Sequence, residues 1–188
     1  MNTVLPIKDI EVINDIADEL KLNRVRDYVL FMTGIYSGSR ISDILKLRVK
    51  DVRNKDQIYV REEKTGKERR YSINNDLKKI FKEYIQGMED WQYLFTSRKG
   101  SNKPITRVRA WGILNEAAAM YGLEHIGTHT LRKTFGYHFH LKYPTKTVEL
   151  QKILNHSSEG VTLQYIGVDQ EKTDKLIKGM SFKRGTRM

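Results

Sequence analysis

Five residues of the chain have the chemistry needed to transfer a phosphoryl group without a metal ion. Arg40 follows a glycine turn, His129 and Arg132 lie three residues apart, and His156 precedes Tyr165 by nine residues. A planar guanidinium matches two phosphate oxygens, a histidine can donate or accept a proton, and a tyrosine oxygen can act as the nucleophile. Such a set could cleave a phosphodiester, with arginines stabilising the charge of the transition state.

Each of these residues also has a structural interpretation. His129 and Arg132 share a face if they lie on one helix, but a helix-start histidine and a surface arginine would look the same. Arg40 stands between apolar segments, so its charge must be paired or face a site. Asp43, one turn later, could hold it in a purely structural ion pair. Tyr165 is one of 10 tyrosines, most of which would serve as core or surface residues.

The elements that must position these residues are mostly helical. Apolar residues recur at helical spacing, and we expect helices over 7–20, 24–36, 39–47, 74–86, 106–121, 129–142, 147–155, 158–165 and 170–178. The segments 57–62 and 68–73 alternate around a charged turn, which predicts an antiparallel hairpin. The chain is therefore predicted to be mainly α-helical with a small antiparallel sheet.

Several details of these elements can be predicted as well. The segment 74–76, Asn-Asn-Asp, offers an N-cap for the helix that follows, and Thr128 can cap the helix from 129, because Asn and Thr side chains accept hydrogen bonds from the first turn. The apolar residues of helix 106–121 are expected to be Val108, Trp111, Leu114, Ala117, Ala118 and Tyr121. The segment 91–95 is expected to be short and buried.

Length, charge and composition limit the partners of the chain. Its 188 residues, 39% of them hydrophobic, suit one compact domain. A formal net charge of +11 and a pI near 9.7 indicate a polyanionic partner such as nucleic acid. A membrane partner is not expected: no apolar run approaches the roughly 18 residues of a span, and no helix pairs a basic face with a wide apolar one. The absence of cysteine excludes disulfides and agrees with a reducing cytoplasm.

Taken in order, four segments resemble the motifs of the tyrosine recombinases, also called phage integrases. The segment 36–43, YSGSRISD, is similar to the family's Thr-Gly-x-Arg-Ile-Ser-Glu/Asp box, and 128–132, THTLR, to its His-x-Leu/Thr-Arg box. KTGK at 64–67 stands at the hairpin turn where the family carries its lysine, and ILNHSS at 153–158 resembles the Leu-Gly-His-Ser-Ser box. Any one box is a weak signal, but four in order with consistent spacing are specific. The resemblance covers nearly the whole chain.

The resemblance implies a role for each of the first five residues. Tyr165 would attack the scissile phosphate and form a 3′-phosphotyrosine. Arg40 and Arg132 would grip the non-bridging oxygens, and His156 would add a hydrogen bond to the same phosphate. The two guanidinium groups are expected to favour the tyrosine phenolate, since a nearby positive charge favours the ionised form. No metal or cofactor is expected.

The resemblance also implies supporting roles. Lys64 would protonate the leaving 5′-oxygen, although Lys67 lies on the same turn and could reach instead. His129 would accept the tyrosine proton or position the hydroxyl, and Asp43 would orient the nearby arginine. Asn155 stands where the family has glycine, and we expect it to adopt a left-handed backbone, which Asn tolerates better than most residues.

The predicted partner is double-stranded DNA, held mainly through its phosphates. The candidate contacts are Arg61, Lys67, Arg69, Arg70, Arg98, Lys99, Lys103, Arg107, Arg109 and Lys133. A type IB topoisomerase, which shares the same residue set, and a DNA-binding module without catalysis are the alternatives.

The whole chain, 1–188, is expected to be a single catalytic domain. The core would cover about 1–168, with a tail over 169–188. The tail would either pack on its own domain or, as the resemblance implies, dock on a neighbouring subunit of a homo-tetramer on DNA. Family members usually carry a further N-terminal core-binding domain, which is expected to be absent, either because the chain is part of a longer protein or because it is naturally single-domain.

Overall fold

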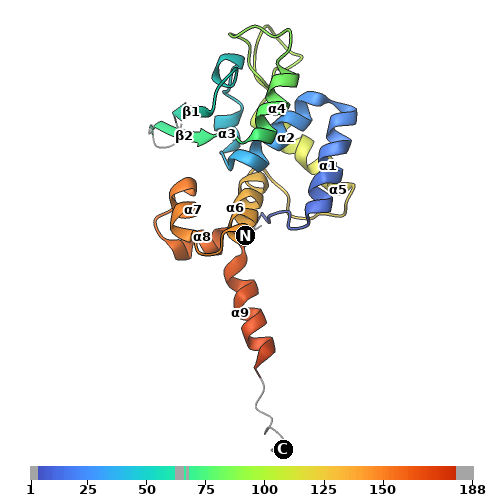
Figure 1. Cartoon of the computed structure of the whole chain (residues 1–188). Helices are drawn as coiled ribbons and strands as arrows, with labels where there is room; N and C mark the ends of the chain where they lie inside the picture. Colours follow the sequence, from blue (N-terminus) through green and yellow to red (C-terminus); the bar gives the residue numbers. More distant parts are fainter. Residues whose placement is uncertain (1–3, 62–65, 67, 181–188) are drawn as a thin grey trace, which may run out of the picture.

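The computed structural model describes residues 4–61, 66 and 68–180, which form helices around one hairpin (Figure 1). The helices are α1 (Ile10–Asn23), α2 (Val25–Ser37), α3 (Ile41–Ile44), α4 (Asn75–Tyr84), α5 (Arg107–Ala119), α6 (Thr130–Lys142), α7 (Thr147–Leu154), α8 (Glu159–Ile166) and α9 (Val168–Gly179). The sheet consists of β1 (Gln57–Arg61) and β2 (Glu68–Ser72), preceded by the 3₁₀ turn η1 (Val49–Asp51). The predicted fold class is confirmed.

The helix α2 runs through the middle of the larger core. Residues 29–31 are consecutive and all buried, so this helix is enclosed on more than one side. Gly34 packs closely on α6, because a Cβ there would lie only 2.4 Å from Leu131 Cδ1. The helix ends at Gly38, whose φ of 60° is the left-handed conformation that glycine adopts readily. This close packing places the segment after α2 next to the start of α6.

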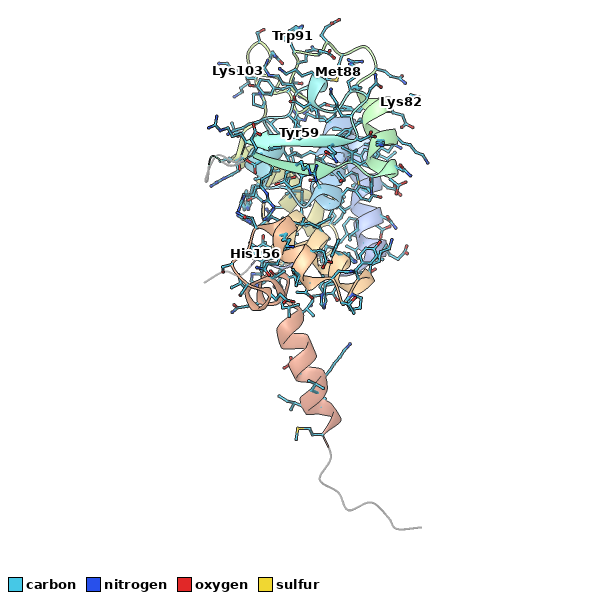
Figure 2. All side chains as sticks on the ribbon, turned by 60° about the vertical axis from the view of Figure 1, so that its left-hand side comes forward. Tyr59, Lys82, Met88, Trp91, Lys103 and His156 are labelled. Atoms are coloured by element: carbon cyan, nitrogen blue, oxygen red, sulfur yellow. The ribbon has the colours of Figure 1, made fainter. Side chains whose placement is uncertain are left out.

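The hairpin has one face on the core and one face in solvent. Its register runs from Gln57 opposite Ser72 to Arg61 opposite Glu68. Ile58 and Tyr71 are cross-strand partners and both are buried, whereas Tyr59 points outward (Figure 2). This alternation is what the sequence pattern predicted.

Of the two predicted helix caps, one is confirmed and one is wrong. The Asn74 side chain accepts a backbone hydrogen bond in the first turn of α4 at 2.8 Å, as predicted. Thr128 does not cap α6, because that helix begins at Thr130 and His129 occupies the cap position. The hydroxyl of Thr130 accepts from the Gly127 N–H at 3.0 Å, which closes the turn before the helix.

The helix α5 buries part of the predicted apolar set. Its buried residues are Ala110, Ile113, Leu114, Ala117 and Ala118, so three of the predicted residues are buried. Val108 is 76% exposed and Trp111 is half exposed, so the expectation is wrong for these two. The buried stripe is turned toward Ala110 and Ile113, which leaves Val108 and Trp111 outside. The segment 91–95 is buried only at Leu94 and Phe95, because its first residue is exposed.

A second, smaller core joins α6, α7 and α8. Its buried members are Tyr137, Leu150, Leu154 and Ile166. The helix α8 lies directly on α6 at Gly136, where a Cβ would be 2.7 Å from Ile166 Cγ2. Tyr165 is the residue before this contact, so the packing of α8 sets its position.

The last helix, α9, projects away from the rest of the described chain (Figure 1). Leu176 and Ile177 on this helix, and Met180 directly after it, are exposed. Among the described residues, no helix combines the length and the apolar character needed to cross a membrane.

Candidate active site

Tyr165, near the end of α8, lies against both predicted histidines. Its hydroxyl is 3.3 Å from Nδ1 of His129, at the start of α6. Its ring centroid is 4.8 Å from that of His156, with the planes 69° apart, an edge-to-face contact. On the same ring, the Nζ of Lys133 lies 5.0 Å from the centroid. The structure therefore brings together residues from three separate sequence motifs.

Arg132 is buried, with 2% of its surface exposed, and joins the two cores. It donates one hydrogen bond to the carbonyl of Gly38 at 2.5 Å and another to the carbonyl of Leu154. Gly38 follows α2 and Leu154 ends α7. One guanidinium therefore ties the larger core to the smaller one. Its charge also acts on Tyr165, where it opposes the rise in pKa that burial causes.

Arg40 occupies the cap position of α3 and is half-buried. The charge of Arg40 lowers the pKa values of His129, His156 and Tyr165, and only burial and Arg132 affect these values more. Arg40 therefore faces the same cluster. Asp43 is 1% exposed and its backbone N–H bonds the Arg40 carbonyl at 2.9 Å. Asp43 follows the arginine by one helical turn, and its role in orienting Arg40 stays a prediction.

The loop after α7 fixes the tautomer of His156. Asn155 has the expected left-handed backbone, with φ 52° and ψ 50°, and turns the chain at the end of the helix. His156 Nδ1 lies 3.2 Å from the hydroxyl oxygen of Thr162, which donates its only proton to the Ser158 carbonyl at 3.0 Å. With the hydroxyl proton assigned to that carbonyl, the Thr162 oxygen accepts from Nδ1, which then carries the ring proton. In the neutral ring Nε2 is then unprotonated.

Burial and the arginines shift all three titrating groups of the cluster. The pKa of His129 is lowered by desolvation first, then by Arg132 and Arg40. The same causes lower the pKa of His156 to about 4. Burial raises the pKa of Tyr165, and this effect outweighs the lowering by the two arginines. The expectation that the arginines favour the phenolate has the right sign, but without DNA the net shift favours the neutral phenol.

The hairpin is attached beside this cluster. Lys64 and Lys67, the predicted general acids, lie outside the described residues. Arg61, at the end of β1, donates from Nε to the Gly66 carbonyl at 3.1 Å. Arg69 on β2 donates to the carbonyls of residues 152 and 153, at the end of α7, so its guanidinium joins the hairpin to the turn that carries His156.

The remaining predicted DNA contacts are spread over the surface. Arg70 is exposed on β2, and Arg107 lies exposed in the first turn of α5. Lys103 lies at the opposite end of the molecule from His156 in Figure 2. The other members are Arg98 and Lys99 on the loop before α5, Arg109 in its first turn, and Lys133 on α6.

Sequence reasoning did not identify three of the contacts at the site. The pairing of Thr162 with a histidine six residues earlier depends on the turn between α7 and α8. The contact of Lys133 with the tyrosine ring and the hairpin link through Arg69 also join segments distant in the sequence. Within the described ranges, no group of three or more His, Asp or Glu side chains is placed to hold a metal ion.

Sequence comparison supports the resemblance independently of the motifs. The sequence profile of the phage integrase family matches residues 3–172. The chain is 51% identical over 174 residues to the probable integrase/recombinase YoeC of Bacillus subtilis, covering 92% of this chain and 94% of that protein. It is 27% identical over 161 residues to the tyrosine recombinase XerA of Pyrococcus furiosus, covering 84% of this chain and 56% of that protein.

Comparison with solved structures shows the same fold. XerA recombinase superposes with a TM-score of 0.72 at 20% identity, over 93% of this chain and 65% of that one. XerH recombinase in a pre-cleavage complex with its difH substrate superposes with a TM-score of 0.70 at 19% identity, covering 94% of this chain and 54% of that one. A lambda integrase dimer bound to a COC′ core site superposes with a TM-score of 0.66 at 15% identity, covering 99% of this chain and 51% of that one. The chain thus spans about half to two thirds of the length of these neighbours.

Proposed function

The chain belongs to the phage integrase family of tyrosine recombinases, and we propose that it cuts and rejoins duplex DNA at specific sites through a covalent 3′-phosphotyrosine at Tyr165. The observation that carries this proposal is the position of the Tyr165 hydroxyl, 3.3 Å from a histidine nitrogen and within reach of the charge of the buried Arg132, which favours the phenolate. A nucleophile beside a base and a cationic clamp is the arrangement that acyl- and phosphoryl-transfer enzymes share.

In the cleavage step, the tyrosine oxygen attacks phosphorus while its proton passes to His129 Nδ1. That nitrogen can accept the proton because its lowered pKa keeps the ring neutral at pH 7. The bond from phosphorus to the 5′-oxygen breaks, and this oxygen takes a proton from Lys64, or from Lys67 on the same turn. The phosphotyrosine ester keeps the bond energy, so attack by a 5′-hydroxyl can reverse the step without ATP.

Arg40 and Arg132 would neutralise the non-bridging oxygens during this step. Two of the five N–H groups of Arg132 bond backbone carbonyls, which leaves donors for the tyrosine and the phosphate. His156 would hydrogen-bond the phosphate through Nε2, and it must gain a proton there to donate, since Nδ1 carries the proton in the free protein. A bound phosphate supplies the negative charge that would raise the pKa of this histidine.

The partners that we propose are duplex DNA and further copies of the chain. XerH and lambda integrase were solved bound to DNA, which supports the first. The exposed apolar residues of the projecting α9 support docking on a neighbouring subunit in a homo-tetramer on DNA. We place the reaction in the cytoplasm, in agreement with the absence of cysteine.

A suicide substrate tests the proposed function directly. The protein is incubated with duplexes that carry a nick near the cleavage position, and the products are separated on a denaturing gel. We expect a DNA-linked protein band that is lost in Tyr165→Phe, which keeps the ring packing. A module without catalysis would give no band on any duplex, including the cognate one. A type IB topoisomerase would relax supercoiled plasmid without exchanging partner strands.

A further inference from the structure

A second cationic site lies at the start of α2, away from the catalytic cluster. A hollow of about 490 Å³ is lined by Arg24, Arg26, Ser97, Arg98, Lys99, Ile105, Thr106 and Arg109. These residues come from the start of α2, from the loop before α5 and from the first turn of α5. Five of the eight are basic and none is acidic.

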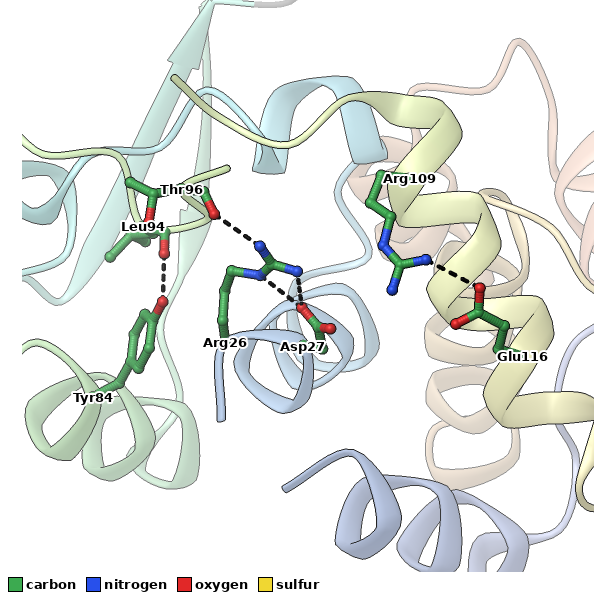
Figure 3. A network of polar contacts seen from close by, with 7 residues as sticks. All are labelled: Arg26, Asp27, Tyr84, Leu94, Thr96, Arg109 and Glu116. Atoms are coloured by element: carbon green, nitrogen blue, oxygen red, sulfur yellow. Dashed lines mark hydrogen bonds and ion pairs between the residues drawn. The ribbon is translucent and has the colours of Figure 1, made fainter. Parts of the chain in front are cut away.

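The positive charge of this hollow is only partly neutralised inside the protein. Arg26 is buried and pairs with Asp27 at 2.6 Å, and Arg109 pairs with Glu116 at 3.0 Å (Figure 3). Arg26 also donates to the Thr96 carbonyl at 2.8 Å, which anchors the loop. These pairs hold two of the cations in place.

The other three cations of the hollow have no such partner. Arg24, Arg98 and Lys99 form no ion pair within the part of the chain that the structure describes. Burial lowers the pKa of Arg24, Arg26 and Arg98 lower it further, and the opposing effect of Asp27 is smaller than each of these. An anion in the hollow would relieve this repulsion.

The hollow also offers neutral donors of the kind that bind phosphate. The first turn of α5 opens on it, and this 13-residue helix directs its unpaired N–H groups and positive dipole toward that end. The Thr106 hydroxyl accepts from the Arg109 N–H at 3.1 Å and keeps its own proton available to a ligand. Arginine forks, a hydroxyl and a helix start together match a phosphate group.

The hollow is connected to the catalytic cluster by a line of positive charge. Arg107, two residues before Arg109 on α5, is close enough to His129 to contribute to the lowering of its pKa, after burial and Arg132, Arg40 and Lys133. The helix α2, with Arg24 before its first residue and Arg40 shortly after its last, has 13 residues. Arg24 and Arg40 therefore lie at opposite ends of a helix about 20 Å long.

We propose that this hollow grips a backbone phosphate of the DNA outside the scissile position, through Arg24, Arg98 and Lys99. The inference rests on the proposed function in one respect, that duplex DNA crosses the catalytic cluster. The proposal gives Arg24 a role in DNA binding and places Arg98 in a defined phosphate-binding hollow. The anchor contacts no reacting atom, so it acts on affinity and register.

The test compares two double variants that each remove two positive charges. The double variant Arg24→Gln with Arg98→Gln removes two of the three proposed anchor cations and leaves the buried Arg26–Asp27 pair intact. Lys55→Gln with Lys82→Gln is the matched control, because both lysines are exposed and line a different hollow. Binding of the full chain to duplexes of 8 to 30 base pairs is followed by fluorescence anisotropy at several salt concentrations, with circular dichroism melting to compare folding.

We expect the anchor variant to bind the 30-base-pair duplex about tenfold more weakly, with a log–log salt slope smaller by roughly one to two. Its affinity should also gain less from lengthening the duplex than that of the wild type does. Equal losses in both double variants, or unchanged length dependence, would overturn the proposal. Saturable binding of inorganic phosphate with an unchanged duplex slope would overturn it as well, in favour of a free anion.

If the glutamine double variant has a lower melting temperature than the wild type, a double variant with lysine at both arginine positions still tests the proposal. Arg24→Lys with Arg98→Lys preserves charge and should retain most of the salt slope, and loss of the slope there would count against a phosphate contact. The suicide-substrate gel separates this proposal from the proposed function. At saturating DNA the anchor variant should still form the phosphotyrosine band, whereas failure of the proposed function would remove the band from the wild type.

Discussion

The two cores of the molecule divide the catalytic cluster between them. The larger core, around α2, carries Arg40, whereas the smaller core of α6, α7 and α8 carries His156 and Tyr165. Arg132 is the physical link between them, because it bonds carbonyls at the end of α2 and at the end of α7. Arg40 therefore rests on an extensive core, and the nucleophile rests on a core of four buried side chains. Movement of the smaller core would displace the nucleophile and disturb the bond from Arg132 to Leu154, while Arg40 kept its place.

The strongest test of this division removes its link. Arg132→Ala leaves two buried carbonyls without a donor and should cost about 3 kcal/mol of unfolding free energy. It should also lower the rate of covalent adduct formation by about 10²–10³. Arg40→Ala should show a similar rate loss with a smaller loss of stability, because this residue is half-buried whereas Arg132 is buried. Thermal melting with suicide-substrate kinetics gives both quantities, and equal melting losses would contradict the bridging role.

One glycine in each core allows the two cores to be disturbed separately. A Cβ at Gly34 would meet Leu131 at 2.4 Å in the larger core, and one at Gly136 would meet Ile166 at 2.7 Å in the smaller core. Both Gly→Ala changes overpack their core and should each lower the free energy of unfolding by about 1–3 kcal/mol. Gly136→Ala should in addition slow adduct formation, because it pushes α8 and hence Tyr165. Gly34→Ala should lower the melting temperature while its adduct rate below melting stays closer to wild type.

Much of this division could be read from the sequence, because the relevant signals are local. Helical periodicity predicted the main helices, and alternation predicted the hairpin. Asn155 was predicted to be left-handed, as it is, because a single side chain decides that backbone conformation. The family motifs named the residues that now cluster around Tyr165.

The rest depended on packing between distant segments. The edges of the face that α5 buries could not be chosen from its pattern, since Trp111 and Ala110 are both apolar and only tertiary packing buries the alanine and exposes the tryptophan. The cap position of α6 falls on His129 and not on Thr128, because Thr130 turns its hydroxyl back to the preceding loop. The bridging role of one arginine requires two backbone carbonyls far apart in the chain, which no local motif encodes.

Within the smaller core, Thr162 should matter for chemistry more than for stability. Thr162→Val removes the acceptor that holds the proton on Nδ1 of His156, so the ring can flip or change tautomer. We expect adduct formation to slow about tenfold, the size typical of groups that orient a functional histidine. Thr162→Ser keeps the hydroxyl and should retain most of the rate. If Val and Ser slowed the reaction equally, the methyl packing would be responsible and the tautomer argument would fail.

The smallest expected effect is a pH dependence of stability confined to the smaller core. His156 has its pKa lowered to about 4 by burial and by Arg132, Arg40 and Arg69, against about 6.5 in the unfolded chain. Between these values the unfolded state binds the extra proton, so stability is complete above about pH 6.5 and is lost as the pH falls toward 4. Because the ring is partly exposed, we expect a loss of only about 1 kcal/mol. Urea unfolding of the wild type and of His156→Gln across this range measures it. The two curves should converge at low pH, and a constant separation would show that the histidine does not titrate differently in the folded protein.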